Sequence, residues 1–121
     1  MTSEEKKAFL LLKSVIFHYH GLDEDEQKNL DETAKKYDAG EELAWANEFI
    51  ANDYISAFER AREYLSNVIG KFDKDKRLSY LDMVWKANNQ KGFITEMEAT
   101  AMLKLAKDWG IENELIEMVK K

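Results

Sequence analysis

The chain of 121 residues contains no proline and only five glycines, and this scarcity of helix-breaking residues constrains its fold more than any other feature. Proline interrupts helix interiors, and glycine commonly follows the last turn of a helix. The segments between the glycines carry apolar residues at helical spacing, and the glycines lie at positions 21, 40, 70, 92 and 110. The sequence therefore predicts a string of helices with short connections and no strand.

The periodicity predicts about seven helices, so the fold class is all-α. We expect Gly21 to end the first helix, and we expect the fourth helix to be the longest and most buried. Asp73 to Lys76 is expected to be a polar connection. The predicted helices cover approximately residues 4–20, 23–38, 40–50, 52–68, 78–88, 95–109 and 112–120.

Two of these helices begin with the spacing of a capping box. Asp23 precedes Glu26 by three residues, and Thr95 precedes Glu98 by three residues. In a capping box the first side chain accepts from the backbone of the third helical residue, whose own side chain accepts from the capping residue. We therefore predict helix starts immediately after Asp23 and Thr95.

An internal repeat relates these two regions at an offset of 72 residues. The repeat predicts two pseudo-symmetric helical halves, over about residues 4–52 and 53–121, within one compact domain. Leu22 and Ile94 match in kind. The identical residues are Glu24, Glu26, Ala34, Lys35, Glu42 and Leu43, which recur as Glu96, Glu98, Ala106, Lys107, Glu114 and Leu115.

Composition narrows the classes of function. With 45% apolar and 35% charged residues, the chain is expected to form a packed domain. A net charge of −6 without a basic stripe disfavours nucleic acid. The apolar run near the start, Ala8 to Leu12, is too short for a signal peptide or a membrane span, so we predict a cytoplasmic protein without membrane insertion.

The sequence contains no recognisable catalytic motif. The chain has no cysteine, no nucleophile elbow and no phosphate-binding glycine loop. Its Asp and Glu residues occur where solvated helix faces and helix caps place them. We therefore predict a protein that is not an enzyme and that needs no cofactor.

The two turns at the start of the repeat resemble those of a known family. They read Tyr19-His20-Gly21-Leu22-Asp23-Glu24-Asp25-Glu26 and Gln90-Lys91-Gly92-Phe93-Ile94-Thr95-Glu96-Met97-Glu98. With the helix order, they make the chain similar to the TerB-like domains of bacterial tellurite-resistance proteins, whose relatives include a region of a membrane-anchored DnaJ-type co-chaperone. The resemblance implies two helical halves and a non-catalytic interaction or scaffold role in bacterial stress response.

The predicted partner-binding site lies on the third helix and its continuation. Trp45 lies beside the apolar stripe of its helix, close to Phe49, and Tyr54 follows near the start of the next helix. An apolar strip of this kind, in an acidic protein, is typical of a groove that binds a partner helix or peptide. We predict docking of an unknown protein at Trp45, Phe49 and Tyr54, by a chain that is a monomer or a weak homodimer.

A divalent-cation sensor is the alternative function. In the TerB-like family the acidic turns are implied to bind a cation, and the corresponding oxygen ligands here would be Asp23, Glu26 and Glu98. The family pattern has Asp before each glycine, whereas this chain has His20 and Lys91 there. An ammonium group at that position opposes the binding of a hard cation.

Overall fold

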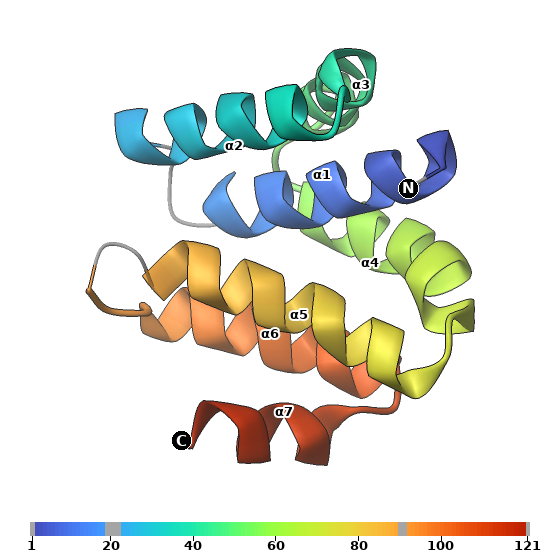
Figure 1. The fold of residues 1–121 in the computed structure, drawn as a ribbon, viewed down its shortest axis with the longest axis vertical. Helices are drawn as coiled ribbons and strands as arrows, with labels where there is room; N and C mark the ends of the chain where they lie inside the picture. Colours follow the sequence, from blue (N-terminus) through green and yellow to red (C-terminus); the bar gives the residue numbers. More distant parts are fainter. Residues whose placement is uncertain (1, 19–22, 90–91, 121) are drawn as a thin grey trace.

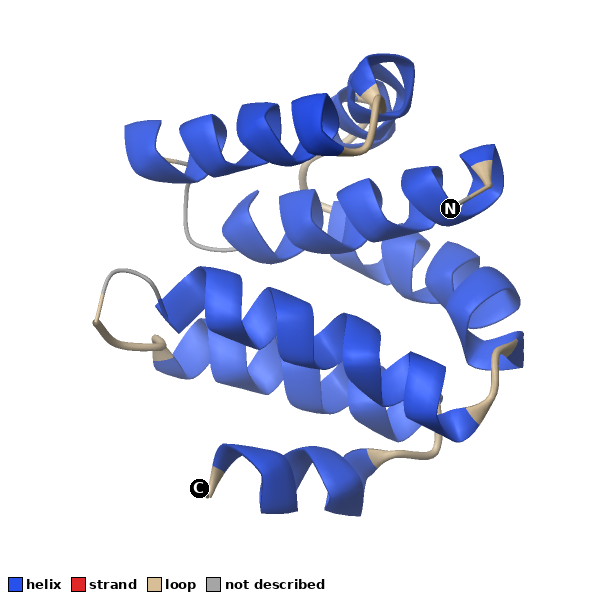
Figure 2. Ribbon diagram, in the orientation of Figure 1, coloured by secondary structure: helices blue, strands red, loops and turns tan. Residues whose placement is uncertain are grey.

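The computed structural model describes residues 2–18, 23–89 and 92–120, and within them the chain is helical without strands (Figure 2). This confirms the predicted all-α class. A 3₁₀ turn, η1, covers Ile69–Lys71. The seven α-helices of the described part are α1 Ser3–His18, α2 Glu24–Lys36, α3 Gly40–Ala51, α4 Ala57–Val68, α5 Lys74–Asn88, α6 Glu96–Asp108 and α7 Glu112–Val119.

Two units of three helices make up most of the molecule. In Figure 1, α2 and α3 lie above α1, and α5, α6 and α7 lie below it. Within each unit all three helices contact one another, and α4 packs against α1, α3 and α6. Both ends of α2 recur in α6 after 72 residues, so the repeat seen in the sequence is a repeat of secondary structure.

The helix starts and helix ends of the two units match in detail. Both predicted capping boxes form completely, at Asp23 and at Thr95. Each middle helix then ends with one residue in the left-handed conformation, Asp38 at φ 52° and Gly110 at φ 70°. The 6→1 hydrogen bond of a Schellman motif closes both turns, from the Ala39 N–H to the Ala34 carbonyl at 2.7 Å and from the Ile111 N–H to the Ala106 carbonyl at 2.8 Å.

The first helix is the centre of the core. Ten consecutive residues of α1, from Ala8 to Phe17, are buried. This helix contacts five others, α2, α3, α4, α5 and α6. The prediction that the fourth helix would be longest and most buried was wrong, because α1 has 16 residues against 12 for α4. A helix covered on every side needs apolar residues around its whole circumference, which a one-sided periodicity does not reveal.

The start of the fourth helix also differs from the prediction. Residues 52–56 form a turn, and α4 begins at Ala57. The Asp53 carboxylate accepts hydrogen bonds from the Ile55 N–H at 3.0 Å and from the Ser56 hydroxyl at 2.9 Å. An Asp side chain that bonds the backbone two residues on stabilises a turn in competition with a helix. The predicted polar connection at 73–76 is likewise mostly helix, because Asp73 caps α5.

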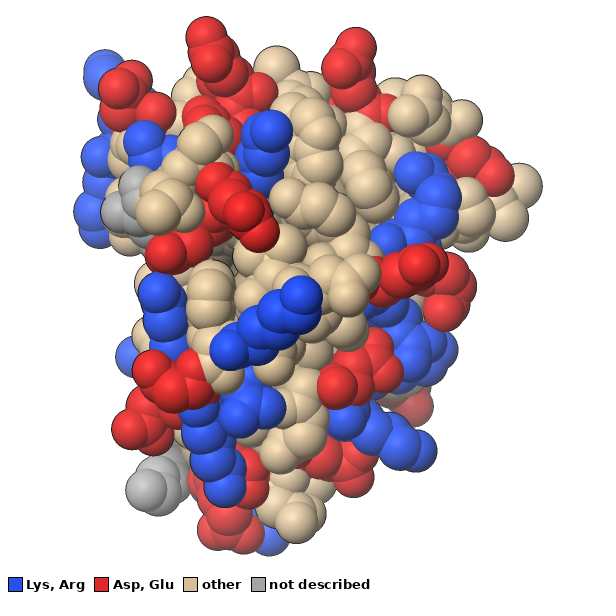
Figure 3. Space-filling model, turned by 90° about the vertical axis from the view of Figure 1, so that its right-hand side faces the viewer, with Lys and Arg blue, Asp and Glu red and all other residues tan. Residues whose placement is uncertain are grey.

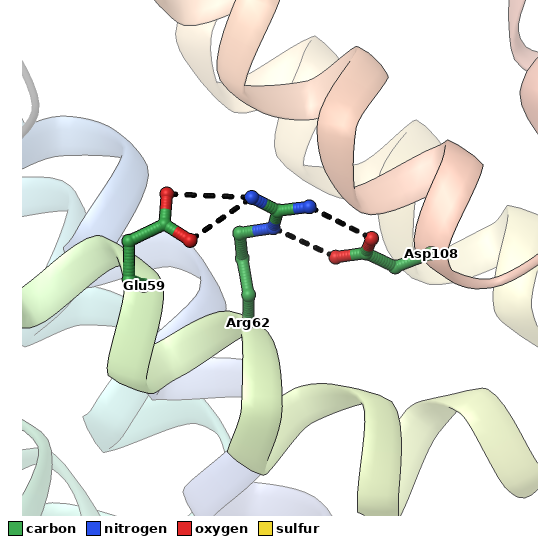
Figure 4. A network of polar contacts seen from close by, with 3 residues as sticks. All are labelled: Glu59, Arg62 and Asp108. Atoms are coloured by element: carbon green, nitrogen blue, oxygen red, sulfur yellow. Dashed lines mark hydrogen bonds and ion pairs between the residues drawn. The ribbon is translucent and has the colours of Figure 1, made fainter.

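An ion-pair network joins α4 to α6 of the second unit (Figure 4). Arg62 on α4 donates two hydrogen bonds to the Asp108 carboxylate at the end of α6, at 2.8 and 2.9 Å. A third nitrogen pairs with Glu59 at 3.0 Å. The hydrogen bonds and charge of Asp108, followed by the charge of Glu59, raise the pKa of Arg62 further above its ordinary value. The guanidinium therefore fixes α4 against α6 in one geometry.

Some sequence predictions concern residues outside the described part of the chain. The predicted end of the first helix at Gly21 lies outside the described residues, and so do the family-motif residues His20, Leu22 and Lys91. Within the described ranges, no helix is both long enough and apolar enough to cross a membrane.

Asp38→Gly is expected to raise the free energy of unfolding by about 0.5–1 kcal/mol, because glycine adopts φ 52° without the steric cost that a Cβ imposes. Gly110→Asp is the matched exchange in the other unit, and it should lower the same quantity by a similar amount. Urea unfolding followed by circular dichroism measures both. Loss of stability in Asp38→Gly would contradict the equivalence of the two turns.

Candidate protein-docking site

An apolar groove of about 270 Å³ lies where the two units meet. Its walls come from the end of α1, the end of α3, the turn at 52–56, the start of α4 and the first turn of α6. Met97 on α6 is the groove-lining residue that comes from the unit of α5, α6 and α7. The lining residues are Val15, His18, Ile50, Tyr54, Ile55, Ala57, Phe58 and Met97.

Three large apolar side chains on this groove are exposed to solvent. Ile55 is 97% exposed, Tyr54 is 67% exposed and Met97 is 49% exposed. Solvent exposure of single apolar residues is common, but several around one hollow indicate a binding surface. The groove therefore stands out as the candidate site for a partner.

The turn that carries Tyr54 and Ile55 is held by Arg60. Its guanidinium donates to the Phe49 carbonyl at 2.9 Å, to the Asp53 carbonyl at 2.8 Å and to the Ser56 hydroxyl at 2.9 Å. The Ser56 and Ile55 hydrogen bonds lower the pKa of Asp53, so the turn contains an ionised carboxylate at neutral pH. These bonds fix the backbone beneath the two exposed side chains. A surface fixed before binding loses less conformational entropy when a partner docks.

Among the groove-lining residues, His18 is the side chain whose ordinary pKa lies close to neutral pH. Desolvation lowers its pKa below the ordinary value, so it is neutral at pH 7. Its ring lies 6.2 Å from that of Tyr54, at an angle of 44°. The groove lining therefore carries no net charge at neutral pH.

Tyr54 belongs to the groove, but Trp45 and Phe49 do not. These two half-buried rings pack against Tyr64 on α4, with centroids 5.1 Å and 6.1 Å from the Tyr64 ring. The Lys7 ammonium lies 5.5 Å from the Trp45 ring, and the Arg60 guanidinium lies 4.8 Å from the Phe49 ring. The structure thus divides the predicted site, because α3 turns Ile50 toward the groove and Trp45 toward α4.

Sequence reasoning missed Ile55 and Met97. The adjacent apolar pair Tyr54-Ile55 follows Asn52-Asp53, a pair typical of turns, and this was a signal that both side chains could be exposed. Met97 gave no such signal, because only the tertiary structure brings the start of α6 to the end of α1.

On the face drawn in Figure 3, acidic and basic side chains are intermingled around a continuous area of uncharged residues.

The carboxylates predicted as cation ligands serve as helix caps. The Asp23 carboxylate accepts from the Glu26 N–H at 2.8 Å, and the Glu26 carboxylate accepts from the Asp23 N–H at 3.2 Å. The Glu98 carboxylate accepts from the Thr95 N–H at 2.9 Å. Among the residues the structure describes, no three His, Cys, Asp or Glu side chains are placed to hold a metal ion. A polar hollow of about 310 Å³ adjoins the start of α2, and the positive end of the helix dipole there disfavours cations. Asp23 and Glu26 line this hollow, but Glu98 does not.

Calcium or magnesium at about 5 mM is therefore expected to change the melting temperature by less than about 1 °C, because a ligand stabilises a fold only by binding it. Circular dichroism melts with EDTA and with each cation measure this. Asp23→Asn keeps a capping side chain and removes one carboxylate, and its response should equal that of the unaltered protein. A cation-specific rise of several degrees would restore the sensor hypothesis.

Lys13 is a buried amine in the interface between α1 and α2. Only 6% of the residue is exposed, and its ammonium donates to the Thr33 hydroxyl at 2.8 Å. Desolvation, followed by the nearby charge of Lys36, lowers the pKa of Lys13 from 10.5 to about 8. The Phe9 ring, 5.6 Å away, is its neighbour on the same helix. The charged form of Lys13 thus destabilises the fold at neutral pH.

The penalty from Lys13 is expected to disappear as pH rises from about 8 to 10.5, because in that interval the unfolded chain binds more protons than the folded chain. Between about pH 7.5 and 9.5 the free energy of unfolding should gain about 1–2 kcal/mol from this group. Lys13→Met should be more stable at pH 7.5 and should lack this gain, as measured by urea unfolding at each pH.

Between about pH 7.5 and 9.5 the ionisation of Tyr80 does not contribute to the change in stability. Desolvation, followed by the charge of Glu5, raises the pKa of Tyr80 to about 12, so this tyrosine destabilises the fold only above about pH 10. Lys107→Met, at an exposed position of α6, is the control and should retain the pH dependence. An equal pH dependence in Lys13→Met and the unaltered protein would contradict the assignment.

Comparison of the chain with protein-family models, with curated proteins and with solved structures gave no match. A functional proposal therefore starts from the groove and its exposed side chains.

Proposed function

We propose that the chain is a non-catalytic protein-interaction domain that binds its partner through the groove beside Tyr54 and Ile55. The supporting observation is the group of exposed apolar side chains on a turn fixed by Arg60, around a hollow that carries no charge at neutral pH. Exposed apolar surface is costly in water and is typical of sites that a partner covers.

Burial of the exposed side chains would supply the binding energy. Complete burial of an isoleucine or methionine side chain contributes about 1.5–3 kcal/mol. Ile55 and Met97 together with the Tyr54 ring thus suffice for a moderate affinity, part of which is lost to the entropy of association. Because the groove is apolar, a partner that presents aliphatic side chains from a helix or a turn fits it best.

The wider role in our proposal is that of a scaffold of the bacterial stress-response type, acting in the cytoplasm. The resemblance of the two turns to TerB-like domains supports this role. The three-helix unit, in which α2 with its N-cap and C-terminal turn recurs as α6, agrees with two related halves.

A photo-cross-linker in place of Tyr54 is expected to capture a protein in cells that naturally express the chain. The matched control carries the same cross-linker at Asn113, an exposed position on α7 away from the groove. Mass spectrometry of the adducts identifies what is bound. Equal adducts from both positions, or none from position 54 in a folded protein, would contradict the proposed docking site.

A further inference from the structure

The groove and the exposed Tyr54-Ile55 turn belong to the same surface, so the surface offers both a protruding apolar residue and a hollow that could receive one. We infer that the groove binds a second copy of this chain, as a two-fold symmetric dimer. This inference rests on the proposed function, because it names the occupant of the same groove. In a two-fold contact each copy contributes both the protruding residue and the hollow.

Ile55 is the protruding residue. Its side chain is 97% exposed, while the backbone beneath it is fixed by the bond from its own N–H to Asp53 and by the bonds that Arg60 donates. The hollow beside it measures about 270 Å³. The dimer would place Ile55 of one copy against Phe58 and Met97 of the other.

Electrostatic repulsion between two copies is weakest where their surfaces carry no charge, and the groove is such a surface. Two copies of a chain with net charge −6 repel each other, and a two-fold axis brings each charge near the axis close to its own equivalent. The groove lining carries no Asp, Glu, Lys or Arg, and burial keeps His18 neutral at pH 7. By contrast, four carboxylates and one ammonium line the hollow at the start of α2, which opposes contact with a second copy there.

Two charged groups near the groove are already engaged. The Asp53 carboxylate accepts from the Ile55 N–H and the Ser56 hydroxyl, and the Lys104 ammonium lies 5.9 Å from the Phe58 ring. Neither group is among the groove-lining residues, so a partner copy meets an uncharged hollow with these charges beside it. The small size of the groove limits the contact, so the dimer is expected to be weak.

Sedimentation equilibrium of the full chain tests the inference. The average mass should rise from 14.1 kDa toward about twice that value as concentration increases from roughly 20 µM to 1 mM. Ile55→Asp should raise the dimer dissociation constant at least tenfold without loss of helicity, because the side chain is exposed and two copies would oppose two carboxylates. Asn113→Asp adds the same charge away from the groove and should leave the constant unchanged.

The outcomes separate this inference from the proposed function. A chain that stays monomeric at 1 mM, or a dimer unaffected by Ile55→Asp, would overturn the second copy as occupant. If the cross-linker at position 54 then still captures a different protein, the proposed docking function survives with another partner. If it captures neither a second copy nor another protein, both proposals fail.

Discussion

Burial of the first helix is the constraint on which the rest of the structure depends. The stretch from Ala8 to Phe17 is removed from water by five other helices, which belong to both three-helix units and to α4. Neither unit could cover this helix alone, so the two units form one core. The apolar free energy of α1 thus holds the units together, and the bond from Arg62 to Asp108 fixes the orientation of α4 against α6.

The groove follows from the same arrangement. The end of α1, the end of α3 and the start of α6 converge on one place, and the turn at 52–56 adds two apolar side chains there. Arg60 has a double role in this region. Its guanidinium lies over the Phe49 ring, while its donors fix the turn that presents Tyr54 and Ile55. A residue that shields one aromatic group therefore helps to expose another.

Local sequence signals predicted the helical class, both capping boxes and the 72-residue repeat. The capping boxes depend on residues close in the chain, such as Asp23 and Glu26. Their hydrogen bonds form at the start of the helix and do not require contacts with other helices. The same signals failed at Asp53, where a side-chain turn competes with a helix. They also failed for the site, because Trp45 and Tyr54 are nine residues apart in the sequence but lie on different surfaces.

The sequence alone determined that the fold is all-helical, that helices begin after Asp23 and Thr95, and that two regions repeat at an offset of 72 residues, because these properties arise from periodicity and from hydrogen bonds within a few residues. Only the tertiary structure decided that α1 is the central helix and that Met97 meets the end of α1. It also decided that the carboxylates of Glu26 and Glu98 serve in separate caps. These results depend on the directions in which helices cross, and such directions are set by the burial of side chains far apart in the chain.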